Sequence, residues 1–321
     1  MSKKFLLLSL LILSALLFGS WGFFAHQKIN RLAVFTLPSG MIKFYKAHID
    51  FITEHAVDPD KRRYADPEEA ARHFLDADHY GKAPFDSIPQ KWNDAVAKFS
   101  EDSVKAHGTV PWQIQKTYYS LVKAFQEKDS LRILRYSADL GHYISDAHVP
   151  LHTTQNYNGQ LSNQHGIHAF WESELPEQFF NDYDFFVGRA RYIENPLKEA
   201  WRIVKTSFSY KDSVLLIEAR LNRSFPSDKK YAFRDRNGKI VKQHSLAYSQ
   251  AYHKALKGLV EQQMRASVLS VGSYWYSAWV DAGQPELKNL RNLPTSAADK
   301  EHLEKEEKLF LEGKPLGRPE H

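Results

Sequence analysis

The stretch "DSLRILRYSADLGHYISDAHVPLH", residues 129–152, carries both the fold class and the chemistry expected of this chain. Apolar side chains recur in it at helical offsets: Leu131, Leu134, Leu140 and Ile144. This period predicts an amphipathic helix from Asp129 to His148. The last twelve residues, 141–152, also hold three histidines and an aspartate. Histidine and aspartate at short, regular offsets are what a metal site needs, so the helix is a candidate source of metal ligands.

Two His–carboxylate pairs in this part of the chain have a spacing of four residues. They are His142 with Asp146, and His168 with Glu172 in "HAFWESEL". Residues four apart lie on one face of a helix, so each pair can hold a metal ion inside a helical bundle. A single pair of this kind is more typical of a solvated helix face. Two pairs that bracket a third histidine, His152, favour a metal site.

The segment that joins the two pairs is a polar loop, "TTQNYNGQLSNQHG", residues 153–166. The first helix must end before Pro150, and the loop is long enough to return the second pair to the first. Two other histidines, His148 and His165, do not share the faces of the pairs. We expect each of them beside the ligands or in solvent, and not as a ligand.

Most of the remaining chain has a helical pattern. Further helices are predicted for Gln27–Leu37, from Pro111 to Phe125, and from Ser245 to Val280 as the longest one. Only residues 231–243 suggest strands, as a hairpin around Asn237 and Gly238. The prediction is an all-α fold, a single multi-helix domain with one small β-hairpin.

Composition places the chain of 321 residues among ordinary globular proteins, with 43% hydrophobic and 25% charged residues. The absence of cysteine excludes disulfides and cysteine-ligated zinc. The net charge of +5 fits an anionic substrate, but the basic residues are scattered and do not by themselves indicate nucleic-acid binding. No stable protein partner is predicted.

Three segments differ in character along the chain. Residues 1–20 contain Lys3 and Lys4 and then an apolar run that is short for a bilayer span. This pattern predicts a cleaved signal peptide and export to the periplasm or the cell exterior, with an uncleaved anchor as the alternative. Residues 21–290 are expected to form one catalytic domain. Residues 291–321 are charged and poor in apolar residues, which predicts a solvated helix or a loose tail.

Three more segments carry residues of the same kind: "WGFFAH" at 21–26, "HAVDPDKRR" at 55–63 and "ARHFLDADHY" at 71–80. Together with the motifs H-x-x-x-D-x-x-x-P-x-H and H-x-x-x-E, they resemble the superfamily of bacterial zinc-dependent phospholipase C and the fungal single-strand nucleases of the S-one/P-one type. The resemblance runs from Trp21 to about residue 280. It implies an all-α domain that encloses a trinuclear zinc site.

The resemblance also implies a ligand set for each of three zinc ions. One set is Asp60, His73, His142 and Asp146. The second set is His152, His168 and Glu172. The third set is the amino nitrogen and carbonyl oxygen of Trp21, together with His26 and the other oxygen of Asp146. All of these ligands offer nitrogen or oxygen, which suits zinc without any thiolate.

Hydrolysis of a phosphodiester is the reaction that this resemblance implies. Zinc ions neutralise the phosphate oxygens and lower the pKa of a bound water to about 7. The implied catalytic role of Asp60 is to align that water and take its proton. Asp60 is favoured over Asp58 because the Asp-x-x-Arg pattern of the family runs here from Asp60 to Arg63.

The substrate class stays open between two branches of the superfamily. The five-residue step from Trp21 to His26 is similar to the nucleases, whereas Glu172 and the short loop after His152 are similar to the phospholipases. The phospholipase C-like branch is favoured, and a single-strand nuclease or nucleotidase is the alternative. A noncatalytic metal- or polyanion-binding helical protein is a further alternative. A di-iron site is disfavoured because the Glu-x-x-His pairs that it needs are absent around His165 and His168.

Overall fold

The computed structural model describes residues 23–236, 239–288, 290, 297–313 and 315–318. The predicted signal peptide (1–20), Trp21 and the hairpin turn at Asn237 and Gly238 lie outside the described residues. Within them, no helix combines the length and the apolar character that are needed to cross a bilayer.

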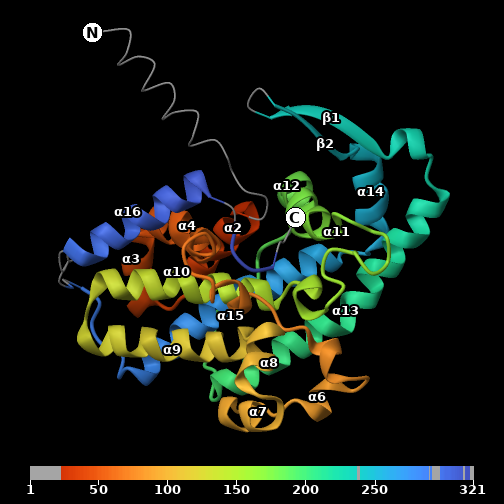
Figure 1. Ribbon diagram of the computed structural model, residues 1–321. Helices are drawn as coiled ribbons and strands as arrows, with labels where there is room; N and C mark the ends of the chain where they lie inside the picture. The colour runs from red at the N-terminus through yellow and green to blue at the C-terminus, as the bar shows by residue number, and fades with distance from the viewer. Residues whose placement is uncertain (1–22, 237–238, 289, 291–296, 314, 319–321) are drawn as a thin grey trace, which may run out of the picture.

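Two long helices lie side by side at the centre of the fold, α9 (Val110–Glu127) and α10 (Ser130–Ala147). Helix α10 begins where the sequence predicts, because the side chain of Asp129 accepts a hydrogen bond from the backbone N–H of Arg132 at 3.1 Å. Its apolar side packs on α9, and it also contacts α2 (Phe23–Ala33) and α15 (Leu259–Asp281) (Figure 1). The predicted helix is therefore confirmed, and it is the central one.

Shorter helices surround this centre: α3 (Ser39–Ala47), α4 (Ile49–Glu54), α5 (Asp58–Arg62), α6 (Pro84–Ser87), α7 (Trp92–Phe99), α8 (Glu101–Ala106), α11 (Ile167–Ala169) and α12 (Leu175–Phe179). The 29-residue helix α13 (Pro196–Ser224) packs across α9. The sequence analysis missed α13. Its buried residues lie mainly around Trp201 and Val204, while other apolar residues of the helix are partly or largely exposed, such as Leu216 (54% exposed), so its apolar period is irregular.

The helix predicted for Ser245 to Val280 is wrong in one respect. The structure has two helices there, α14 (Leu246–Ala255) and α15, with a break between them. Lys257 and Gly258 both have positive φ angles, 53° and 82°. A left-handed pair of residues cannot continue a right-handed helix, and glycine adopts this conformation without a steric cost.

The predicted hairpin is confirmed as two antiparallel strands, β1 (Tyr231–Arg236) and β2 (Lys239–His244). The predicted tail contains a helix, α16 (Ala297–Glu312). This helix is not loose, because the ring of Phe310 packs against Phe23 at 6.2 Å and Tyr64 at 5.0 Å between ring centroids. The fold class is all-α with one two-stranded sheet among the described residues.

Candidate metal centre

Eight of the predicted ligands lie within the described residues, and they come from separate segments of the chain. Seven of them are buried: His26, His73, His142, Asp146, His152, His168 and Glu172. The eighth, Asp60 in α5, is half-buried. Three groups of side chains place one ligand atom each within 4.8 Å of the others. The first group is Asp60 with His73 and His142, and the second group is His152 with His168 and Glu172. The remaining one, His26 with His142 and Asp146, lies between them.

The first group brings α5, α10 and the segment after the 3₁₀ turn Ala70–Arg72 together. Asp60 Oδ1 lies 3.7 Å from His73 Nδ1 and 3.6 Å from His142 Nε2. Asp146 Oδ2 lies 3.0 Å from the same nitrogen of His73 and 3.2 Å from the same nitrogen of His142. Two carboxylates and two imidazoles therefore direct their ligand atoms at a common point.

The second group is built by the segment that follows Pro150 and by the helical turns around Glu172. His152 lies in the 3₁₀ turn Pro150–Thr153, and its Nε2 is 3.2 Å from Glu172 Oε2. His168 Nε2 is 2.7 Å from that same oxygen. Although residues 170–174 form a π-helical stretch, the spacing of four residues still brings His168 and Glu172 together.

His26 on α2 connects the two groups. Its Nε2 lies 3.3 Å from Asp146 Oδ1 and 3.4 Å from Glu172 Oε1. The two oxygens of Asp146 thus face different partners, since Oδ2 faces His73 and His142 while Oδ1 faces His26. A carboxylate in this position can bridge two cations.

Backbone carbonyls orient the imidazoles from outside the cluster. His142 Nδ1 donates to the carbonyl of Ala56 at 2.8 Å, and His152 Nδ1 donates to the carbonyl of His73 at 2.7 Å. His168 Nδ1 donates to the carbonyl of Tyr157 at 3.3 Å. A carbonyl can only accept, so Nδ1 carries a hydrogen and Nε2 is the nitrogen turned toward the centre, as in a metal-ligating histidine.

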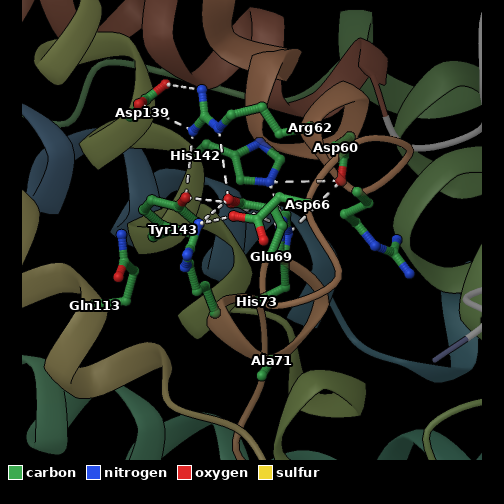
Figure 2. A network of polar contacts seen from close by, with 12 residues as sticks. Asp60, Arg62, Asp66, Glu69, Ala71, His73, Gln113, Asp139, His142 and Tyr143 are labelled. Atoms are coloured by element: carbon green, nitrogen blue, oxygen red, sulfur yellow. Dashed lines mark hydrogen bonds and ion pairs between the residues drawn. The ribbon is translucent and has the colours of Figure 1, made fainter. Parts of the chain in front are cut away.

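His73 is oriented by a carboxylate that the sequence analysis missed. Its Nδ1 faces the cluster, and its Nε2 lies 3.5 Å from Oε1 of the fully buried Glu69. Tyr143 donates its hydroxyl hydrogen to Glu69, and Arg62 and Arg72 form ion pairs with the same carboxylate. Figure 2 shows this network beside Asp60 and His142. The signal in the sequence is the four-residue spacing of Glu69 and His73, the same spacing as in the two ligand pairs.

The charge of the outer network is balanced farther from the cluster. The guanidinium of Arg62 also lies 3.0 Å from Asp139, one helical turn before Tyr143 on α10. Burial raises the pKa of Asp139, and the charge of Arg62 opposes that rise. Glu69 therefore sits among two cations and a phenol, where its negative charge is well compensated while it holds His73.

The protonation of the central groups indicates a site with excess negative charge. Burial would raise the pKa of Glu172, but His152 and the other imidazoles outweigh it and hold that pKa well below its usual range. The pKa of Asp146 is lowered in the same way, with His142 as the largest opposing charge. Burial lowers the pKa of His73, yet Asp146 and Glu69 raise it to about 10. These carboxylates are ionised and attract cations.

The donor set and its unsatisfied atoms fit a metal cluster. Asp146 Oδ2 is buried and accepts no hydrogen bond of good geometry, despite the two imidazole nitrogens close to it. Buried polar atoms usually have a hydrogen-bond partner, so an ionised oxygen without one fits a metal ligand. Imidazole nitrogen with carboxylate oxygen is the ligand chemistry that zinc takes when cysteine is absent.

A comparison with known families decides the assignment. A family model described as zinc-dependent phospholipase C matches residues 25–235. The chain belongs to that family. The zinc-dependent phospholipases C are hydrolases of phosphodiester bonds, and the ligand groups lie within the matched residues. No curated protein matches the chain.

Three residues that the sequence offers as candidates do not belong to the three ligand groups. Asp58 accepts from His55 Nδ1 at 2.6 Å and lies 3.8 Å from Lys61, so it faces away from His73. His148, which directly follows α10, is buried, and its Nε2 meets the hydroxyl of Ser270 at 3.0 Å. His165 is exposed. The position of Trp21 lies outside the described residues.

The C-terminal arm, Leu316–Arg318, is a second feature that the sequence analysis did not anticipate. The guanidinium carbon of Arg318 lies 3.5 Å from the ring centroid of Tyr157 and 4.0 Å from that of Phe74. Arg318 Nη1 lies 2.6 Å from Asp76. Phe74 follows His73 directly and Tyr157 holds His168, so the arm of this phospholipase C family member rests against two segments that carry ligands. The expectation of a loose tail is wrong for these residues.

Proposed function

We propose that this protein is a secreted, phospholipase C-like phosphodiester hydrolase with three zinc ions per chain. The single observation that supports the cluster most strongly is the position of Asp146, whose two oxygens face separate groups of imidazoles. The family supports zinc and the reaction class. The number of zinc ions and the phospholipid substrate are the parts that we add.

The third zinc ion in this proposal needs the amino terminus of a processed chain. Only two described imidazole or carboxylate atoms, His26 Nε2 and Asp146 Oδ1, are assigned to it, and they lie 3.3 Å apart. Helix α2 begins at Phe23, two residues after Trp21. A free α-amino group has a pKa near 8 and can lose its proton to a metal ion, whereas an amide nitrogen is a poor ligand. Removal of residues 1–20 would therefore complete the site.

Two forms of the protein test this role of Trp21. One begins at Trp21, and the other carries two extra residues in front of it. We expect the first form to bind one more zinc ion per chain by elemental analysis and to hydrolyse phosphodiesters faster. Equal zinc content and equal rates in the two forms would remove the amino terminus from the ligand set.

Asp60 is the residue that we propose as the base. Its side chain is 17% exposed, against 1% for His73 and 0% for His142, so Asp60 is the member of the first group that solvent reaches. Its carboxylate is therefore placed to orient a water molecule and accept its proton at the edge of the cluster. When bound, zinc supplies neutralisation of the phosphate oxygens and acidification of that water.

Direct comparison of substrates tests the proposed activity. Zinc-loaded protein that begins at Trp21 is assayed at equal concentration on short-chain phosphatidylcholine and on single-stranded DNA. We expect faster cleavage of the phospholipid, because the family match, Glu172 and the short loop between His152 and His168 favour that branch. A strong preference for DNA would assign the protein to the nucleases. No cleavage of either substrate or of a generic aryl phosphodiester would favour a noncatalytic binding protein.

A further inference from the structure

The hairpin β1–β2 carries large apolar side chains that no other part of the described chain covers. Phe233 is 72% exposed and Ile240 is 69% exposed. The strand register pairs Phe233 with Lys242 and Ile240 with Asp235, and residues directly opposite each other share a face. Phe233 and Ile240 therefore lie on one face of the hairpin, together with one residue of each charge, Asp235 and Lys242. Figure 1 shows the hairpin extending from the helical body near α12 and α14.

The base of the hairpin is fixed to the segment that holds the second ligand group. His244, the last residue of β2, stacks on the ring of Phe170 with 3.7 Å between centroids, and its backbone N–H donates to Glu174 at 3.2 Å. Phe170 lies between His168 and Glu172 in the sequence. The base of the hairpin is thus attached to the segment that carries the second ligand group, and the position of the hairpin sets how the centre faces any surface that the hairpin touches.

The hairpin segment, residues 228–243, has six basic and two acidic residues, a net charge of 6 − 2 = +4. They are Lys229, Lys230, Arg234, Arg236, Lys239 and Lys242 against Asp228 and Asp235. Lys242 Nζ lies 3.9 Å from the ring centroid of Tyr231, on the face that carries Phe233. Lys230 is already paired with Glu218 at 3.2 Å, so the other cations carry the remaining positive charge of the segment. Exposed apolar side chains in a segment of net positive charge are the pattern of a segment that lies at the surface of an anionic membrane.

We propose that this hairpin docks the protein onto an anionic phospholipid surface. Phe233 and Ile240 enter the boundary between head groups and acyl chains, and the net positive charge of the segment attracts the lipid phosphates. This inference rests on the proposed phospholipid substrate. It explains how the metal centre reaches phospholipids that are assembled in a bilayer. Single-stranded nucleic acid could stack on Phe233 and Tyr231 of this face, but it would leave the aliphatic side chain of Ile240 exposed, whereas a lipid surface covers Phe233 and Ile240 together.

Binding to vesicles tests the proposal separately from catalysis. Flotation is measured with vesicles of phosphatidylcholine alone and with added phosphatidylglycerol, using zinc-loaded Asp60→Asn protein so that lipid is not consumed. We expect binding that requires the anionic lipid and weakens with salt. Phe233→Ser combined with Ile240→Ser should lower the binding constant roughly tenfold or more, since both apolar side chains lose their burial.

The matched control changes two apolar side chains that belong to other surfaces, Phe35 (54% exposed) and Phe186 (87% exposed). Phe35→Ser with Phe186→Ser should bind vesicles as the parent does. With Asp60 restored, the hairpin variant should cleave a soluble aryl phosphodiester at the unchanged rate and long-chain vesicle lipid more slowly. Vesicle binding that is absent in the parent, unchanged in the hairpin variant, or replaced by DNA binding would overturn the docking role. Failure to cleave any phosphodiester would instead overturn the proposed function.

Discussion

At the scale of single residues, the site depends on which atom of each side chain faces the centre. Asp146 on α10 contacts imidazoles on two sides, because its Oδ1 faces His26 and its Oδ2 faces His73. His148, only two positions later, points to Ser270 instead. Asp146 and His148 therefore have different surroundings although they are only two residues apart.

The first prediction concerns these two neighbours. Asp146→Asn should lose at least one zinc ion per chain and reduce phosphodiesterase activity at least about a hundredfold, since it removes a charge from two ligand sets. His148→Asn should keep the zinc content, because its partner is a hydroxyl outside the cluster. Elemental analysis and rate measurements on the two purified variants check this. Loss of zinc in both variants would contradict the assignment of faces on α10.

The second prediction concerns Glu69, which orients His73. Glu69→Gln keeps the size of the side chain but removes the charge opposite Nε2 of His73, so zinc affinity should fall about 10–100-fold. The matched control is Glu68→Gln, whose parent side chain is 63% exposed and faces Lys105. Zinc affinity is measured by competition with a chelator. Equal affinities in the two variants would show that Glu69 has no orienting role.

At the scale of elements, the C-terminal arm packs against the short segments that follow His73 and His152. Arg318 is enclosed by Phe74, Tyr157 and Asp76, and its side chain is only 14% exposed. Burial raises the pKa of Asp76, and the charge of Arg318 opposes this rise. The arm thus compensates a buried carboxylate that lies three residues after a predicted ligand.

The third prediction follows from that enclosure. Arg318→Ala should lower the free energy of unfolding by about 1–3 kcal/mol, because it leaves the carboxylate of Asp76 buried without its cation. Arg202→Ala, which breaks an exposed ion pair with Glu199, should cost less than about 1 kcal/mol. Urea unfolding of zinc-loaded protein compares the two. A loss for Arg318→Ala no larger than for Arg202→Ala would contradict a structural role of the arm.

At the scale of the whole molecule, the cluster joins segments that lie far apart in the sequence. α2, α5, α10 and the segments around His73, His152 and His168 all contribute atoms to one buried site. Without a metal ion, the carboxylates of the ligand groups repel one another, and protonation of the neighbouring imidazoles offsets this repulsion. Metal binding therefore links these segments and contributes to stability.

The fourth prediction is the effect of metal removal and its dependence on pH. Dialysis against a chelator should lower the melting temperature by about 10 °C or more at pH 7. Because the pKa of His73 is raised to about 10 in the metal-free site, His73 is protonated at pH 7 and must release a proton when zinc binds. Zinc affinity should therefore rise with pH from 6 to 8. Calorimetry in buffers of different ionisation enthalpy measures the released protons, and a value of zero would contradict this protonation.

Local spacing was sufficient to predict several features of this protein. Residues four apart on a helix share a face whatever surrounds them, so the pairs His142–Asp146 and His168–Glu172 could be recognised from their positions. The central helix and the hairpin follow from equally local periods. The resemblance to a family then gave the remaining ligand positions, and the structure brings the described ones together.

Other features depend on contacts between distant segments, which no local period encodes. Asp58 and Asp60 are equivalent by composition, and only the packing of α5 against α10 turns Asp60 toward His73 and His142. The same holds for Glu69, whose partners Arg62 and Tyr143 come from other elements, and for Arg318, which is held by rings far away in the sequence. Helical periods arise from hydrogen bonds between near neighbours, whereas the direction of a side chain toward a site arises from how whole elements pack.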